Sequence, residues 1–240
     1  MEIIEILGFA GALLIGLVLG LIGGGGSILT VPILVYILSV DAVVATAYSL
    51  FVVGTTALVG AIRNAQMGMI DYRTGVVFAI PAFVAVYLTR QFLVPAIPDE
   101  LFTAGSFVFT KQIGIMVFFG FIMLLASYSM IKGRKDSAGS TDQVKFNYPL
   151  ILVEGFIVGG LTGLVGAGGG FLIIPALVLL AKLPMKKAVA TSLMIIAAKS
   201  LIGFLGDVNN IEIDWIFLLS FTAISVLGIF VGIYLNKFID

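Results

Sequence analysis

Long apolar runs dominate this sequence and decide which solvent it can fold in. A helix that crosses the hydrocarbon core of a bilayer needs about 20 mostly apolar residues. Seven runs of that kind lie at residues 3–22, 43–62, 74–95, 106–131, 148–166, 187–206 and 215–236. Charged residues make up only 11% of the chain, against about 25% in soluble domains. The sequence therefore predicts an all-α integral membrane protein with seven long spans.

Two shorter apolar runs, 27–38 and 171–181, each follow a cluster of glycines directly. A 12-residue helix is only about 18 Å long, roughly half of the hydrocarbon core. We therefore expect two half-helices, so that 3–38 and 148–181 are each a helical hairpin broken at a glycine-rich tip. The sequence leaves open whether these hairpins span the membrane fully or enter and return.

An internal duplication organises the chain. A shift of 143 residues aligns 16–71 with 159–214 without a gap, and 18 of the 56 aligned positions are identical. The expected first repeat is 1–131 and the second is 148–240, joined by a polar linker at 132–147. The first repeat holds the hairpin 3–38 and the spans 43–62, 74–95 and 106–131. The second holds the hairpin 148–181 and the spans 187–206 and 215–236.

The charges near the spans predict the orientation, because Lys and Arg collect in cytoplasmic loops. The linker carries four cations, three more lie at 182–187 around the start of the span 187–206, and the charged residues of the loop 207–214 are all acids. The best assignment puts ten cations inside and only Arg90 outside, with Lys111 and Lys199 within spans. The prediction is a multi-pass cell-membrane protein with its N-terminus outside and its linker and C-terminus cytoplasmic. Parallel repeats would misplace a cationic cluster, so the repeats are expected to be inverted, as in many secondary transporters.

The two glycine-rich tips are the expected binding site. Within a bilayer, non-helical backbone is tolerated only inside protein or beside a water-filled cavity. Each tip also leads into the N-terminus of a half-helix, where free N–H groups and a partial positive charge attract anions. The alternative is that glycines only allow close helix packing, and we assign that role to Gly16, Gly20, Gly159 and Gly163. The candidate substrate-binding residues are Gly23, Gly24, Gly25, Gly26, Ser27, Gly166, Ala167, Gly168, Gly169, Gly170, Ser49, Ser192 and Lys199.

Lys199 is a cation within a predicted span, at a cost of about 2.5–3.5 kcal/mol unless it is paired. It is either the counter-charge of an anionic substrate or the structural partner of Glu154, and the sequence leaves both open. Ser49 and Ser192 occupy equivalent positions in the two repeats, although most hydroxyls in spans bond their own helix. Asp71 and Asp214 also repeat, and each is expected to be a helix N-cap.

The composition excludes several classes of protein. The chain has no His and no Cys, which rules out Ser–His hydrolysis and metal sites built on these residues. Lys plus Arg and Asp plus Glu both number 13, so no basic excess points to nucleic acid. We expect no enzyme, metal or cofactor. The leading hypothesis is a secondary transporter for a small anion, and the alternative is a passive anion channel or a non-transporting receptor. A proton is a candidate coupling ion, with Glu154 as its carrier, and the oligomeric state is left open.

The repeated motifs resemble those of the TauE/SafE family of sulfite exporters and related anion permeases. The resemblance lies in the doubled glycine-rich tip followed by an apolar run and proline, in Ala190-Thr191-Ser192, and in the Ile-Asp-aromatic steps at 70–72 and 213–215. It implies a permease for sulfite or organosulfonates that binds its substrate at 23–27 and 166–170. The first tip, Gly-Gly-Gly-Gly-Ser, departs from the family pattern, and the second repeat has no counterpart of the 106–131 helix.

Overall fold

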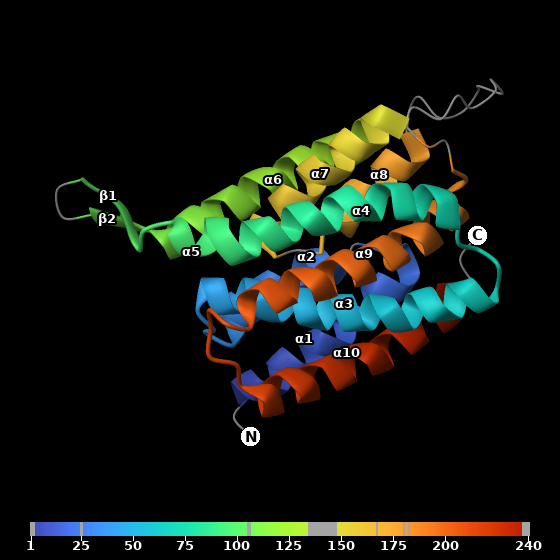
Figure 1. The fold of residues 1–240 in the computed structure, drawn as a ribbon. Coiled ribbons are helices and arrows are strands. Elements are labelled where there is room, and N and C mark those ends of the chain that lie inside the picture. Colours follow the sequence, from blue (N-terminus) through green and yellow to red (C-terminus); the bar gives the residue numbers. More distant parts are fainter. Residues whose placement is uncertain are drawn as a thin grey trace.

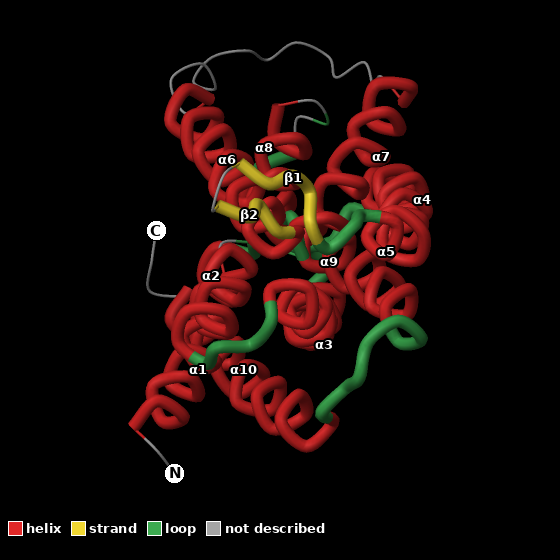
Figure 2. Tube along the Cα trace, turned by 90° about the vertical axis from the view of Figure 1, so that its left-hand side faces the viewer, coloured by secondary structure: helices red, strands yellow, loops and turns green. Residues whose placement is uncertain are grey.

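The computed structural model describes residues 3–24, 26–104, 107–133, 148–166, 168–179, 181 and 183–236. These residues form an elongated bundle of helices with a two-stranded hairpin at one end (Figures 1 and 2). The helices are α1 (Ile3–Ile22), α2 (Gly26–Pro32), η1 (Ile33–Ile37), α3 (Ala42–Gln66), α4 (Tyr72–Leu88), η2 (Thr89–Leu93), α5 (Val94–Ala96), α6 (Lys111–Gly133), α7 (Tyr148–Val165), α8 (Gly170–Leu179), α9 (Met185–Asp207) and α10 (Trp215–Asn236). The strands are β1 (Glu100–Ala104) and β2 (Phe107–Thr110).

Five helical segments in the described part of the chain are long and apolar enough to cross a membrane. They are α1, α3, the continuous segment Tyr72–Ala96, α9 and α10. Shorter apolar stretches are Gly26–Ile37, Lys111–Leu125 and Ile151–Val165. The helical, multi-pass membrane architecture is therefore confirmed, while the count of seven spans stays a prediction. The two predicted half-helices correspond to α2 with η1 and to α8.

One expected boundary was wrong. Residues 107–110, predicted to lie in a helix from 106, form β2, and the helix begins at Lys111. The strand pairs antiparallel with β1, and the rings of Phe102 and Phe109 stack at a centroid distance of 4.8 Å. Hydropathy alone does not separate an apolar strand from a span, whereas the aromatic and β-branched residues of Phe-Val-Phe-Thr favour a strand.

Aspartates begin three of the long helices. The Asp41 carboxylate accepts a hydrogen bond from the Val43 N–H at 2.8 Å, and Asp71 accepts from the Thr74 N–H at 2.9 Å. Asp214 accepts from the N–H of Phe217 at 3.0 Å. The N-cap roles predicted for Asp71 and Asp214 are confirmed.

Helices that are equivalent in the duplication make equivalent contacts. α1 packs along α10, and α7, the counterpart of α1, packs along α4, the counterpart of α10. A Cβ added to Gly16 would lie 1.8 Å from the Ser225 carbonyl oxygen, and one on Gly159 would lie 2.3 Å from that of Ala82. Ser225 and Ala82 are themselves 143 residues apart. The packing role expected for these two glycines is confirmed. Gly20 and Gly163 are similarly crowded by Ile229 and Thr89.

The paired helices α3 and α9 lie side by side in the middle of the bundle (Figures 1 and 2). The ring of Phe51 packs on that of Phe204 at 4.9 Å between centroids. Nearer the end of α3, Gly60 meets Leu193. A later residue of α3 thus contacts an earlier residue of α9, so these two equivalent helices are antiparallel.

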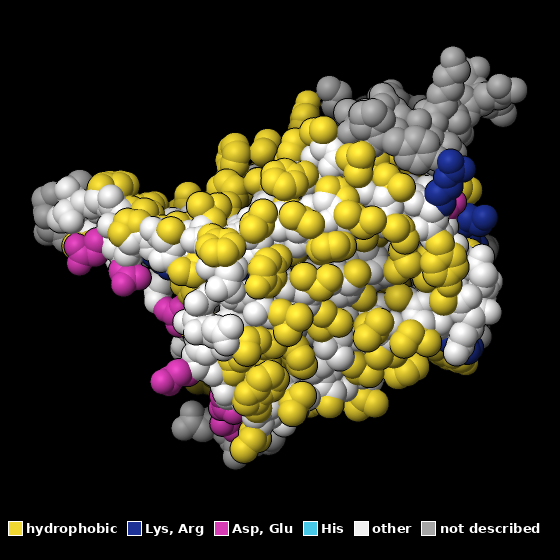
Figure 3. Space-filling view, in the orientation of Figure 1, with side chains coloured by type: hydrophobic (Ala, Val, Ile, Leu, Met, Phe, Trp, Pro, Cys, Tyr) yellow, Lys and Arg dark blue, Asp and Glu magenta, His cyan; other side chains and the backbone are white. Residues whose placement is uncertain are grey.

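The bundle is polarised in charge along its length. Acidic side chains gather at the end that carries β1 and β2, and basic side chains gather at the opposite end (Figure 3). Within α3 the same polarity runs from the N-cap Asp41 to Arg63 in the last turn. Between the two ends the visible face is largely apolar (Figure 3).

Candidate functional site

The two glycine-rich tips meet in the interior of the bundle. A Cβ on Gly24 would lie 2.5 Å from the carbonyl carbon of Gly170, and one on Gly170 would lie 2.4 Å from the Gly24 Cα. The structure thus brings together two candidate clusters that are far apart in sequence. Gly25 and Ala167 lie outside the described residues, and every other member of the two tips is buried.

Several tip glycines are required by the backbone itself. Gly23, Gly166, Gly168 and Gly169 have φ between 61° and 79°, a left-handed conformation that glycine adopts without steric cost. The N–H groups of the equivalent Gly23 and Gly166 each donate to the carbonyl four residues earlier, at 2.8 Å, where α1 and α7 end. A bulky substitution here would disturb the turn regardless of any ligand, so the tips are better tested through the side chains around them.

Lys199 of α9 lies against the second tip. Its side chain is fully buried, and its Nζ donates a hydrogen bond to Thr162 Oγ1 at 2.6 Å. A Cβ on Gly169 would lie only 2.7 Å from the same Nζ. The Thr162 hydroxyl in turn donates to the carbonyl of Gly159 at 3.2 Å. A positive charge is therefore held at the tip by a neutral partner.

The ion pair between Lys199 and Glu154, one of the two interpretations of the sequence, is not formed. In the part of the chain that the structure describes, the salt bridge within 4.0 Å is Arg90–Asp207, and Lys199 has no carboxylate partner. Glu154 stands eight residues before Thr162 in α7, which is about 12 Å along the helix axis. Its Oε2 is buried and has no hydrogen-bond partner among the described residues. The geometry thus favours the counter-charge interpretation of Lys199.

The candidate serines divide into two groups. Ser27 donates to the Gly24 carbonyl at 2.7 Å, and Ser192 donates to the Val189 carbonyl at 2.8 Å with the Gly23 carbonyl at 3.3 Å. Both hydroxyls therefore support the first tip. Ser49 is also fully buried, but its Oγ has no hydrogen-bond partner among the described residues. It lies one turn of α3 from Thr46, which packs on Gly166 of the second tip.

Sequence reasoning missed one buried charge pair. The sequence places Arg90 at the outer surface and Asp207 in an acidic loop, but the two side chains are buried, at 0% and 2% exposure. Arg90 Nη1 lies 3.3 Å from Asp207 Oδ2 and donates to Thr46 Oγ1 at 3.0 Å. The sequence could have indicated a buried pair, because each charge lies at the end of an apolar run, where an unpaired charge is costly. Nothing local in the sequence pairs residues that are this far apart.

Ser200, beside Lys199, is a further buried hydroxyl without a partner in the described part of the chain. No group of three or more His, Cys, Asp or Glu side chains that could hold a metal ion occurs among the described residues. The buried centre therefore consists of glycine backbone, hydroxyls and one ammonium group. Such a centre, enclosed by apolar helices and broken hairpins, is the arrangement expected of a secondary membrane transporter.

Comparison with known proteins identifies the family. Residues 8–240 match the sequence model described as "Sulfite exporter TauE/SafE". The chain belongs to this family, and the resemblance seen in the sequence motifs is confirmed. The chain is accordingly a membrane transporter and not an enzyme. No solved structure matches it.

Curated relatives agree with this assignment. The "probable membrane transporter protein YunE" of Bacillus subtilis is 30% identical, and the alignment covers 94% of this chain and 86% of the relative. A "probable membrane transporter protein" of Xylella fastidiosa is 27% identical over 90% of this chain and 78% of its own length. The "probable membrane transporter protein MJ0441" of Methanocaldococcus jannaschii is 29% identical over 89% and 78%.

Proposed function

We propose that this protein is a secondary transporter that carries a small oxyanion, sulfite or an organosulfonate, bound between the two tips. The observation that carries the proposal is the buried Lys199 ammonium, which lies against Gly169 and, among the described residues, has the neutral Thr162 as its hydrogen-bond partner. Buried cations in membrane proteins usually face a substrate path or an opposite charge. A bound anion would supply that opposite charge.

The surroundings of Lys199 favour a small ligand with several acceptor oxygens. Gly24 and Gly170 touch through their backbones, so the tips must separate to admit an anion, and a compact anion requires the smallest separation. Gly170 begins α8, and the N-terminus of a helix favours negative charge. The Ser49 hydroxyl, which has no partner in the described part of the chain, adds a donor. The family description, sulfite exporter, supports the same substrate class.

We further propose that the two repeats are inverted, with seven spans in all. This is supported by the antiparallel contacts of the equivalent helices α3 and α9. The charge polarity in Figure 3 supports an N-terminus outside and a cytoplasmic C-terminus, because cations collect on the cytoplasmic side. The linker 132–147, predicted to be cytoplasmic, lies mostly outside the described residues. Inverted repeats provide alternating access by rocking one unit against the other.

A carrier agrees better with the tip geometry than a channel does. All the described tip residues are buried, whereas a conducting pore needs a continuous polar path. A carrier saturates with substrate, and its flux requires the closed tips to open alternately to the two sides.

The test is anion transport by the purified protein in proteoliposomes, with sulfite, methanesulfonate and acetate as the probes. We expect saturable flux of the two sulfur oxyanions. Lys199→Met should weaken their binding about 10- to 100-fold. A hydrogen bond to a charged group contributes about 1.5–3 kcal/mol, and this fold-change is the corresponding change in the dissociation constant. Lys111→Met is the matched control, because Lys111 begins α6 beside β2, away from the tips. Undiminished binding by Lys199→Met, or equal loss in the control, would refute the proposal.

A further inference from the structure

Arg90 is a second buried cation whose hydrogen-bonding capacity is only partly used. Its exposed fraction is 0%, and both of its polar contacts, to Thr46 and to Asp207, are made by Nη1. Its Nε and Nη2 have no hydrogen-bond partner among the described residues. Leaving buried donors unpaired is costly. If the Arg90–Asp207 pair served stability alone, hydrogen-bond partners for Nε and Nη2 would make the protein more stable.

The position of Arg90 relates it to the tip site. Thr46, which accepts the hydrogen bond from Arg90, also packs on Gly166, the first residue of the second tip. On its other side, Gly206 packs on the Cβ of Arg90. The guanidinium thus stands between the second tip and the end of α9, and its ion pair joins η2 of the first repeat to α9 of the second.

The duplication allows the two ends of the molecule to be compared. Arg90, Gly206 and Asp207 correspond to Ile233, Arg63 and Asn64 in the other repeat. The first three are buried, whereas Arg63 is exposed and Ile233 and Asn64 are partly exposed. The contact between α9 and η2 is therefore closed at one end of the bundle, and its counterpart between α3 and α10 is more open at the other.

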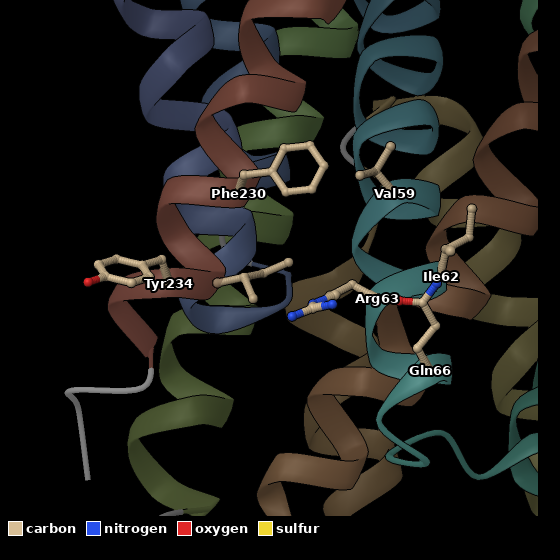
Figure 4. A pocket seen from close by; sticks show the side chains of 7 residues that line it. Val59, Ile62, Arg63, Gln66, Phe230 and Tyr234 are labelled. Atoms are coloured by element: carbon tan, nitrogen blue, oxygen red, sulfur yellow. The ribbon is translucent and has the colours of Figure 1, made fainter.

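A cavity of about 430 Å³ marks the more open counterpart. Figure 4 shows Arg63 of α3 pointing toward α10 within it. The lining residues include Val59, Ile62 and Gln66 from α3 and Phe230, Ile233 and Tyr234 from α10. The equivalent contacts at the two ends of the bundle therefore differ, since Arg90 and Asp207 are buried at one end and Arg63 is exposed at the other.

We propose that Arg90 is a second anion-binding residue, on the branch of the path that leads from the tips toward the β1–β2 end, and that Asp207 occupies it while this side is closed. The proposal rests on the proposed function. An incoming oxyanion replaces the Asp207 carboxylate on the guanidinium and meets the free Nε and Nη2 donors. The planar fork of arginine binds oxyanions through paired hydrogen bonds. The Asp207 side chain, released from Arg90, frees α9 from η2, and this side opens.

The decisive variant is the double substitution Arg90→Gln, Asp207→Asn, which removes both charges of the pair, so that neither partner is left as a buried charge without the other. We would measure the half-saturating sulfite concentration in oriented vesicles, separately from the β1–β2 side and from the opposite side. We expect the half-saturating concentration to rise at least tenfold on the β1–β2 side and to stay within about twofold on the opposite side. A tenfold change corresponds to about 1.4 kcal/mol. Asp207→Asn alone should lower it on the β1–β2 side, because Arg90 has lost its competitor. Wild-type values on both sides, or equal changes on both, would show a structural pair and overturn the proposal.

A second readout does not depend on transport. The chain has no native cysteine, so Ser49→Cys is a single reporter one turn from Thr46. We expect a membrane-impermeant maleimide added from the β1–β2 side to label it faster when Asp207→Asn is also present, and Arg90→Lys to keep the slow rate. Unchanged labelling in Asp207→Asn would overturn the gating role. Absent sulfite flux in the wild type would instead overturn the proposed function, while the labelling would still report on Asp207.

Discussion

Replacing Lys199 by methionine is the sharpest test of how the buried centre is built. The substitution keeps an unbranched apolar side chain in the same place and removes only the charge and the hydrogen bond to Thr162. If no carboxylate balances Lys199, the protein should become more stable and lose affinity for its anion. If a carboxylate does balance it, the protein should become less stable.

The contacts give the size of the effect. A lysine at the centre of a spanning helix costs about 2.5–3.5 kcal/mol, and a hydrogen bond from a charged group returns about 1.5 kcal/mol at the low end. The Thr162 hydroxyl keeps its own bond to the Gly159 carbonyl, so no new unpaired donor is created. Lys199→Met should therefore raise the free energy of unfolding by about 1–2 kcal/mol. Breaking a buried pair with Glu154 would instead lower it by about 3–5 kcal/mol.

The assay compares wild type, Lys199→Met, Glu154→Gln and the double variant by unfolding in mixed detergent micelles. We expect the single lysine variant to be more stable than wild type and the two substitutions to be additive. Sulfite at about 100 times its dissociation constant should stabilise the wild type by about 2.7 kcal/mol and stabilise Lys199→Met much less. A destabilised lysine variant that is rescued by adding Glu154→Gln would refute this account of the site.

Three further predictions follow from the same contacts. Cysteines at the exposed Met67 and Asn209 should be labelled by impermeant reagents from opposite sides, the first from the cytoplasm and the second from outside; labelling of both from one side would contradict the inverted repeats. Gly16→Ala should destabilise the α1–α10 contact by at least about 1–3 kcal/mol, whereas Gly120→Ala, with nothing within 4 Å of its Cβ, should be neutral or slightly stabilising; equal melting temperatures would contradict the packing argument. Ser49→Ala should not lower stability, since the buried hydroxyl has no partner among the described residues and an unpaired buried donor is costly, but it should weaken sulfite binding in a titration; full affinity would remove Ser49 from the site.

The helical framework could be predicted closely because two strong constraints act on it. The bilayer sets the length of a span, so the apolar runs 3–22 and 215–236 coincide with α1 and α10. The duplication fixes the repeated capping positions, and Asp71 and Asp214 cap their helices in the same way. Strand β2 was not predicted because it lies outside the duplicated segment and its apolar residues continue directly into the apolar run of α6.

The site was only partly predictable, because its pairings are not local. The glycine clusters could be read as converging tips, and Gly24 and Gly170 do touch. The partner of Lys199, Thr162, is a hydroxyl among many, and no sequence pattern distinguishes it from Glu154. Ser49 and Ser192 occupy equivalent positions, yet only Ser192 is used by the backbone of a tip. Equivalent residues thus have different hydrogen-bond partners in the two repeats.

That asymmetry indicates where the chemistry of the protein lies. The elements shared by both repeats, chiefly glycines and caps, hold the frame, and their contacts repeat residue for residue. The buried charges do not repeat. The residue equivalent to Lys199 in the first repeat is Thr56. Its hydroxyl donates to Ser225 Oγ at 3.1 Å instead of facing a tip. The residues equivalent to Arg90 and Asp207 are Ile233 and Asn64, which carry no charge. Under the proposed anion transport, a two-fold frame with two cationic centres would offer two equal anion sites, whereas charges at single positions would make the two ends of one path differ. On that proposal, each such charge is better explained by a transported anion than by the frame itself.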